Sequence, residues 1–218
     1  MRKLHAIIMF TIALAFASSS YAEMKYGVSA ALTNIEASGT ETENTEKNSK
    51  SVDSLVVIPS IFAEYAYSDT FAIGLDYIPF KADVSDSTHS RTDTETSVTG
   101  TAATTSTTRN QKAEAELKNH TTLYANYNVG AGYIKVGAVY VELDTGESLG
   151  TGSKYGNETI YGGVIGFGME EGNIRAELLY TDYEDISLTS SVARTGVTTN
   201  NKIDAELDTL AFKLSYLF

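Results

Sequence analysis

The chain ends in Leu210-Ala211-Phe212-Lys213-Leu214-Ser215-Tyr216-Leu217-Phe218, and every second residue from Leu210 onward is large and apolar or aromatic. Lys213 and Ser215 occupy the opposite parity. Because the side chains of a β-strand alternate between two faces, one face of this stretch suits an apolar environment and the other is partly polar. The stretch therefore predicts a strand that ends at Phe218.

The first residues have the pattern of a secretory signal. Arg2 and Lys3 precede an uncharged apolar run over 6–17, and small residues follow at Ser20 and Ala22. This order predicts a signal peptide over 1–22 and one domain over 23–218. The alternative is a membrane-spanning helix, but a run of about 12 residues is shorter than the roughly 20 that a span needs. Since the chain contains no cysteine, we expect neither disulfides nor a lipoprotein anchor.

Charge and hydropathy narrow the class of protein. The formal net charge is −12, which argues against nucleic acid and anionic surfaces as partners. After the signal, no run of about 18 apolar residues remains to form a transmembrane helix. A closed β-barrel is then the membrane structure open to this chain, because lipid offers no partners to backbone polar groups.

Alternation of apolar and polar residues predicts eight strands. They lie near 24–35, 52–67, 70–81, 113–127, 131–143, 155–169, 173–183 and 203–218. Their connections alternate between short turns (68–69, 128–130, 170–172) and long loops (36–51, 82–112, 144–154, 184–202). Short turns at one end and long loops at the other are typical of outer-membrane barrels. In the Thr-rich loop 82–112 we expect the flanking strands to continue as a projecting hairpin.

These features, with the terminal Tyr216-Leu217-Phe218, resemble the small eight-stranded outer-membrane barrels of the OmpA/OmpX type. The resemblance covers nearly all of 23–218. It implies an all-β, eight-stranded antiparallel transmembrane up-and-down β-barrel in the outer membrane, surrounded by outer-membrane lipid and lipopolysaccharide. It also implies that Tyr216 and Phe218 belong to the assembly signal read by the barrel-assembly machinery. Nothing follows Phe218, so the cell-wall-binding domain of OmpA is not expected.

Aromatic residues gather near the predicted strand ends. One group lies near the short turns: Tyr65, Tyr67, Phe71, Tyr127, Phe167, Tyr216 and Phe218. A second lies toward the long loops: Tyr77, Tyr140, Tyr161 and Tyr180. Two aromatic girdles at the membrane interfaces would explain both groups.

The parity opposite the apolar one carries most of the strand charges. The residues expected to face the lumen are Glu64, Asp76, Lys118, His120, Lys135, Glu158, Arg175, Glu177 and Lys213. The interior of an eight-stranded barrel is just wide enough for side chains to fill, and an unpaired buried charge costs several kcal/mol. We therefore expect these charges to pair and plug the lumen; a narrow ion path is the alternative.

The loops contain no recognised ligand motif, and we expect a monomer with a structural or surface-interaction role. That role would be membrane integrity, adhesion to a host surface, or binding of an extracellular ligand. A passive channel is the first alternative. A soluble lipocalin-like binder would need the opposite arrangement, with a polar outside and an apolar inside.

We expect no enzyme, cofactor or metal. A lipid A-modifying barrel would need a nucleophile, a base and a carboxylate in contact, and neither His89 nor His120 comes with such a set. The acidic residues Asp83, Asp86 and Asp93 do not follow a calcium-loop pattern.

Overall fold

The computed structural model describes residues 23–43, 45–83, 89–99, 103–148, 154–191 and 199–218. The predicted signal, 1–22, lies outside them. The described residues form eleven strands: β1 Glu23–Glu43, β2 Glu46–Ala66, β3 Phe71–Tyr77, β4 Ala82–Asp83, β5 His89–Thr99, β6 Ala103–Val129, β7 Gly132–Ser148, β8 Glu158–Glu171, β9 Ile174–Tyr183, β10 Ile186–Thr189 and β11 Lys202–Leu217. No helix among the described residues is long and apolar enough to cross a membrane.

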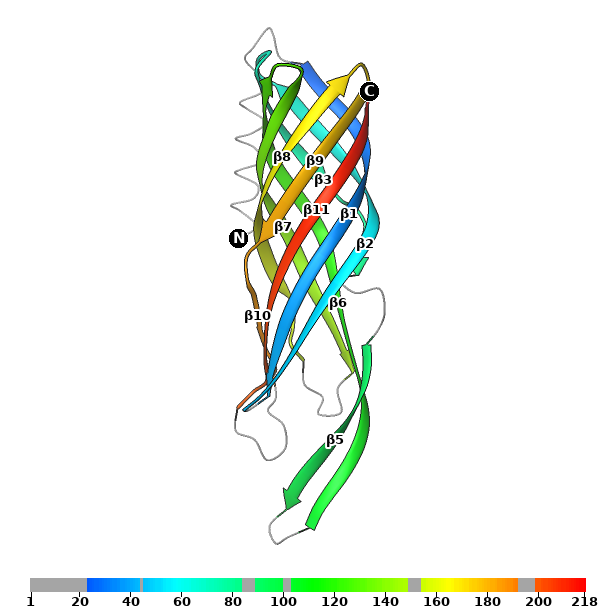
Figure 1. The fold of residues 1–218 in the computed structure, drawn as a ribbon, viewed down its shortest axis with the longest axis vertical. Helices are drawn as coiled ribbons and strands as arrows, with labels where there is room; N and C mark the ends of the chain where they lie inside the picture. Colours follow the sequence, from blue (N-terminus) through cyan, green and yellow to red (C-terminus); the bar gives the residue numbers. More distant parts are fainter. Residues whose placement is uncertain (1–22, 44, 84–88, 100–102, 149–153, 192–198) are drawn as a thin grey trace, which may run out of the picture.

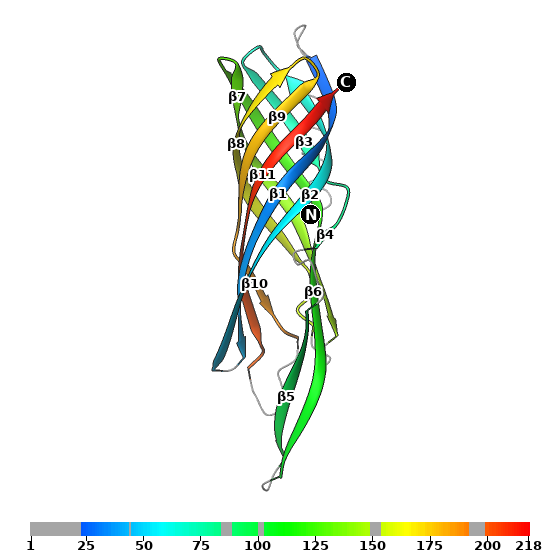
Figure 2. The same ribbon diagram turned by 45° about the vertical axis from the view of Figure 1, so that its right-hand side comes forward.

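Eight of these strands close into a ring. Their order is β1-β2-β3-β6-β7-β8-β9-β11, and β11 pairs back onto β1 from Gly27↔Leu217 to Thr42↔Lys202 (Figures 1 and 2). Every neighbouring pair is antiparallel. The short strands β4 and β5 pair onto β6, and β10 pairs onto β11. The prediction of an eight-stranded antiparallel up-and-down barrel is confirmed, because closure gives each strand two neighbours.

The short turns lie at the end of the barrel where the chain terminates (Figure 1). Gly130 and Gly172 stand in the turns β6–β7 and β8–β9 with φ of 61° and 59°. This left-handed conformation suits glycine, which has no Cβ to clash. The turn between β2 and β3 is held by the amide of Phe71, which donates to the carbonyl oxygen of Ser68 at 3.3 Å.

At the opposite end, the strands run further than expected. The β1–β2 ladder continues to Glu43↔Glu46, and the β6–β7 ladder to Lys112↔Ser148. Residues 36–43, 46–51 and 144–148, predicted as parts of loops, are therefore strand. The hairpin expected within 82–112 is confirmed, since β5 pairs with β6 from His89↔Ala113 to Thr99↔Ala103 and projects beyond the barrel (Figure 2). Continued pairing satisfies backbone groups that a loop would leave to water.

A β-bulge in β6 reverses the faces of that strand. The β6–β7 register shifts between Lys118 and Thr121, and Asn119 has a φ of 55°. On the hairpin side of the bulge, Leu117 is buried opposite Leu143. Leu117 was expected on the outer, apolar parity, and the structure places it inside. The extra residue of a bulge changes which side chains point inward.

The outer face of the ring is apolar. Its exposed side chains include Val28, Leu32, Val57, Ile61, Leu75, Leu123, Ile134, Val136, Ile165, Phe167, Leu178, Leu210, Phe212 and Leu214. Tyr65, on the same parity, is an exception because it is buried. An apolar surface of this extent is foreign to a soluble monomer. The faces are therefore opposite to those required by the lipocalin-like alternative.

Candidate functional site: the barrel lumen

The half of the lumen nearest the short turns is filled by ion pairs. Arg175, which is 2% exposed, donates from Nη1 and Nη2 to the two carboxylate oxygens of Glu64 at 2.8 and 2.9 Å. It also donates to Glu170 at 2.6 Å, and Lys25 contacts the other oxygen of Glu170 at 2.6 Å. A guanidinium that binds two carboxylates in this way fixes three strands relative to one another.

Two further pairs extend this network toward the middle of the barrel. Lys135 contacts Glu177 at 2.5 Å, and Lys213 forms an ion pair with Asp76. We call the eight residues of these pairs the charged layer: Lys25, Glu64, Asp76, Lys135, Glu170, Arg175, Glu177 and Lys213. Four carboxylates balance four cationic groups, so the layer is neutral as a whole. Neutrality and short contacts offset the cost of removing these charges from water.

Aromatic and polar side chains complete the hydrogen bonds of the charged layer. Tyr124 donates to Glu64 at 3.1 Å, Tyr133 donates to Glu177 at 2.6 Å, and Asn126 donates to Glu64 at 2.8 Å. The ammonium of Lys135 lies 3.8 Å from the centroid of the Tyr124 ring. Buried carboxylates are thus bonded by several donors, which is the condition for a buried network to be stable.

Two glycines make room for these tyrosines. Gly74 faces Tyr124 and Gly168 faces Tyr133 in the ladder. A Cβ at either glycine would lie 2.2 or 2.3 Å from the opposite ring. Each ring therefore lies directly over a backbone that has no side chain, and this brings its hydroxyl to the carboxylates.

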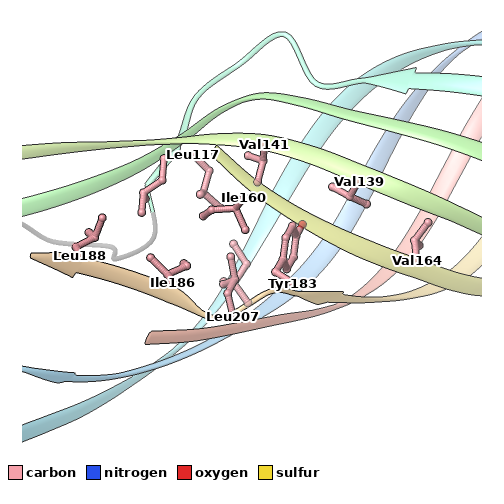
Figure 3. Packing of buried hydrophobic residues seen from close by; sticks show 11 residues of the cluster. Leu117, Val139, Val141, Ile160, Val164, Tyr183, Ile186, Leu188 and Leu207 are labelled. Atoms are coloured by element: carbon pink, nitrogen blue, oxygen red, sulfur yellow. The ribbon is translucent and has the colours of Figure 1, made fainter. Parts of the chain in front are cut away.

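The half of the lumen nearest the hairpins is mostly apolar. We call its buried cluster the aliphatic layer: Ile35, Leu117, Val139, Val141, Leu143, Ile160, Val164, Tyr183, Ile186, Leu188 and Leu207. Figure 3 shows these side chains converging from several strands into one interior. Val141 is fully buried and Ile160 is 1% exposed. Packing at this density leaves little room for a continuous water path.

The structure brings together six of the nine residues expected in the lumen: Glu64, Asp76, Lys135, Arg175, Glu177 and Lys213. His120 faces the lumen apart from the ion pairs, with Nε2 3.0 Å from the hydroxyl of Tyr183. Glu158 stands at the register position of the buried Leu143, away from the charged layer.

The expectation that Lys118 faces the lumen is corrected by the structure. Lys118 shares its register position with Glu142, and its ammonium forms an ion pair with Asp144. The bulge at Asn119 explains the difference, because its extra residue turns Lys118 to the outer face of the strand. Sequence reasoning also missed Lys25 and Glu170. Both stand on the parity opposite an exposed apolar neighbour, Tyr26 and Met169 respectively, so alternation alone could have found them.

Tyrosine hydroxyls mark the edge of the apolar outer band that is nearest the hairpins. Tyr140 donates to Glu142 at 2.8 Å, and Tyr180 donates to Asp208 at 3.2 Å. At the other end Tyr216 and Phe218 are exposed, with ring centroids 5.5 Å apart. A tyrosine with its ring in the apolar band and its hydroxyl among polar groups suits a membrane interface.

The described residues contain no group of three or more His, Cys, Asp or Glu side chains placed to hold a metal ion. The chemistry of the lumen is that of paired charges and packed apolar groups. Together they tie the eight strands and fill the interior.

No protein-family model matches the chain, and no curated protein matches it. Solved structures with a similar fold include Ail, the attachment invasion locus protein of Yersinia pestis, at 9% identity and a TM-score of 0.40, covering 90% of this chain and 99% of that one. Neisserial surface protein A has 12% identity and a TM-score of 0.40, with the same coverage. The outer membrane protein AlkL has 12% identity and a TM-score of 0.49, covering 92% of this chain and 93% of its own.

Similarities at this level carry no inference about activity. The fold itself rests on the closed ring of eight antiparallel strands and on the apolar band around it. A closed barrel with an apolar outside is what the hydrocarbon core of a membrane permits, because all backbone groups are paired between strands. The chain has the fold of the small eight-stranded outer-membrane β-barrels.

Proposed function

We propose that this protein is a monomeric outer-membrane barrel that closes its own lumen and presents β-hairpins at the cell surface, where they contact another surface or an extracellular ligand. The observation that carries the proposal is the β5–β6 hairpin. Its strand β5 has 11 residues, and at about 3.3 Å per residue it reaches roughly 35 Å. It projects away from the barrel end that carries the other hairpins (Figure 2).

This hairpin has two free edges in the part of the chain that the structure describes. Residues 103–111 of β6 pair with β5, whereas the ladder to β7 begins at Lys112. A strand edge without a neighbour presents backbone donors and acceptors to a partner. Addition of a strand to such an edge is a common mode of peptide recognition. A surface contact by strand addition is therefore the mode of binding that we propose.

The orientation can be tested by labelling with a membrane-impermeant maleimide. The chain has no cysteine, so single-cysteine variants have no background. We expect Thr96→Cys in β5 to label on intact cells, and Asp69→Cys in the β2–β3 turn to label only after the outer membrane is permeabilised. Labelling of Asp69→Cys alone on intact cells would contradict the proposed orientation.

The surface role can be tested by replacing 89–111 with a two-residue Asn-Gly turn. We expect unchanged barrel folding, seen as an unchanged shift in gel mobility on heating, but loss of attachment of producing cells to glass and to one another. Attachment that survives the replacement, with a folded barrel, would contradict a role for the hairpin.

A passive channel is less well supported by the lumen. The charged layer is electrically balanced and the aliphatic layer is packed. We expect no large, stable conductance when the refolded protein is placed in planar bilayers. Stable openings would favour the channel instead. The proposal includes no catalytic step.

A further inference from the structure

The wall of the barrel has a stretch where β2 and the segment 78–83 are not paired, which we call the seam. The β2–β3 ladder stops at Ile61↔Tyr77, where β3 ends. The next segment, 78–83, stays with β6: the amide of Ile78 donates to the carbonyl oxygen of His120 at 3.0 Å, and Ala82 pairs with Leu117. Within the described residues, no ladder pair joins 78–83 to the stretch 54–60 of β2. Pro79 lacks an N–H, which disfavours pairing there.

The seam lies at the edge of the apolar outer band that is nearest the hairpins, where Lys81 of the seam segment forms an exposed ion pair with Glu116 of β6. Leu55 and Val57, on the β2 side, are 65% and 67% exposed, more than any other aliphatic side chain of the described band. Phe80, on the other side, is 58% exposed. With these apolar side chains beside the Lys81–Glu116 pair, the mouth suits the boundary between lipid acyl chains and head groups. Unpaired strand edges at membrane depth are tolerated where they line a cavity that holds polar groups or water.

A luminal cavity of about 100 Å³ lies behind the seam. Ile58 from β2 and both Ile78 and Phe80 from the seam segment line it. On the side of the charged layer the cavity is lined by Asp76, Lys135 and Lys213. On the side of the aliphatic layer it is lined by residues that include Leu117 and Val164. Phe80 of the seam segment both lines the cavity and is exposed on the outer surface, so the seam is the side from which we expect access.

The polar groups of the cavity select the chemistry of an occupant. The charges in its lining are already paired, Asp76 with Lys213 and Lys135 with Glu177. His120 also lines it, and its Nδ1 is buried without a hydrogen-bond partner among the described residues. A buried unpaired nitrogen is costly, and one hydroxyl would satisfy it as donor or as acceptor.

From this geometry we infer that the cavity is a binding site for a short, neutral aliphatic amphiphile, which enters through the seam from the lipid, hydrogen-bonds His120 with its hydroxyl and leaves its tail between Ile58, Ile78 and Phe80. The volume of about 100 Å³ suits the hydroxyl and the first carbons of such a molecule, since an apolar cavity of about 150 Å³ holds benzene, and the rest of the tail lies in the seam beside Phe80. A carboxylate would find no free cation in the described lining, so a neutral head is favoured. The site does not depend on the β5–β6 hairpin.

The test uses the full barrel in lipid nanodiscs, with protonated isoleucine methyl groups and 1-hexanol as the probe. We expect nuclear Overhauser effects from 1-hexanol to Ile58 and Ile78 that saturate with concentration. The methyl of Ile165, which faces lipid and is 56% exposed, reports simple partition into the bilayer and should not saturate.

Two variants test whether the probe binds in this cavity. Ala211 is buried in the cavity lining, so Ala211→Leu should fill the space and abolish saturable binding. Ala138 stands on the outer, exposed face, so Ala138→Leu is a matched control that should bind normally. The mobility shift on heating confirms that each variant is folded. Saturable binding that persists in Ala211→Leu, or effects at Ile58 and Ile78 that never saturate, would overturn the inference.

A third variant tests the head group. His120→Phe should weaken 1-hexanol about five-fold, as expected for the loss of one hydrogen bond between neutral groups. Hexane should bind the wild type and His120→Phe equally. Equal affinity of 1-hexanol for both proteins, or tighter binding of hexanoate than of 1-hexanol, would overturn the assignment of a neutral head bonded to His120.

Discussion

The two halves of the lumen are closed by different forces. The charged layer near the short turns contains Arg175, 2% exposed, in contact with Glu64 and Glu170. The aliphatic layer near the hairpins contains Val141 and Ile160, equally buried but without a charge. Electrostatic pairing is geometrically exacting and tolerates no missing partner, whereas apolar packing loses stability gradually as volume is removed. The inward-facing side chains of the same strands thus close the lumen in two ways, by ion pairs in one half and by apolar packing in the other.

The largest effect is expected in the charged layer. Arg175→Ala leaves Glu64 buried without its guanidinium, and we expect a loss of about 3–5 kcal/mol in the free energy of unfolding. Urea unfolding in lipid vesicles, followed by circular dichroism, would measure it. The double variant Arg175→Met with Glu64→Gln should regain much of the loss. A cost below about 1 kcal/mol for Arg175→Ala would remove the distinction between the two layers.

A smaller effect is expected where an aromatic ring lies over a glycine. Gly168→Ala places a methyl 2.3 Å from the ring of Tyr133, which must shift away from Glu177. We expect a loss of about 1–3 kcal/mol, measured by the same unfolding experiment. Gly163→Ala is the matched control, because its Cβ would meet nothing within 4 Å. Equal costs for the two changes would contradict this account of how the ring is positioned.

The aliphatic layer should respond more weakly to a conservative change. Ile160→Val removes one methylene from a packed site, and we expect a loss of about 1 kcal/mol that does not change with salt. Ile165→Val, on the exposed outer face, is the control. If Ile160→Val destabilised as strongly as Arg175→Ala, the aliphatic layer would be as intolerant as the charged one.

The smallest effect is expected outside the lumen. The side chains of Lys118 and Asp144 are 28% and 23% exposed, and a partly solvated pair contributes less than about 1 kcal/mol. Lys118→Ala should therefore cost little, and the cost should shrink as the salt concentration rises. A loss above 3 kcal/mol would place Lys118 in the lumen after all.

Much of the charged layer could be predicted because alternation is a local property. Glu64, Asp76, Arg175 and Lys213 follow the inward parity of regular strands, and the structure buries all four. Lys118 could not be placed, because a bulge at Asn119 depends on pairing with β7, a separate strand. In β7 the aliphatic layer is marked by the buried Val139, Val141 and Leu143, which alternate with the outward Glu142 and Asp144.

The sequence by itself determined the closed ring of eight strands, the end at which the short turns lie, and the face that carries the charges, since these follow from side-chain alternation and from the spacing of turn residues. Only the tertiary structure decided which charges pair, that half of the lumen is aliphatic, and that a seam opens between β2 and the segment 78–83. Those outcomes depend on the register between strands, which is set by packing across the whole ring.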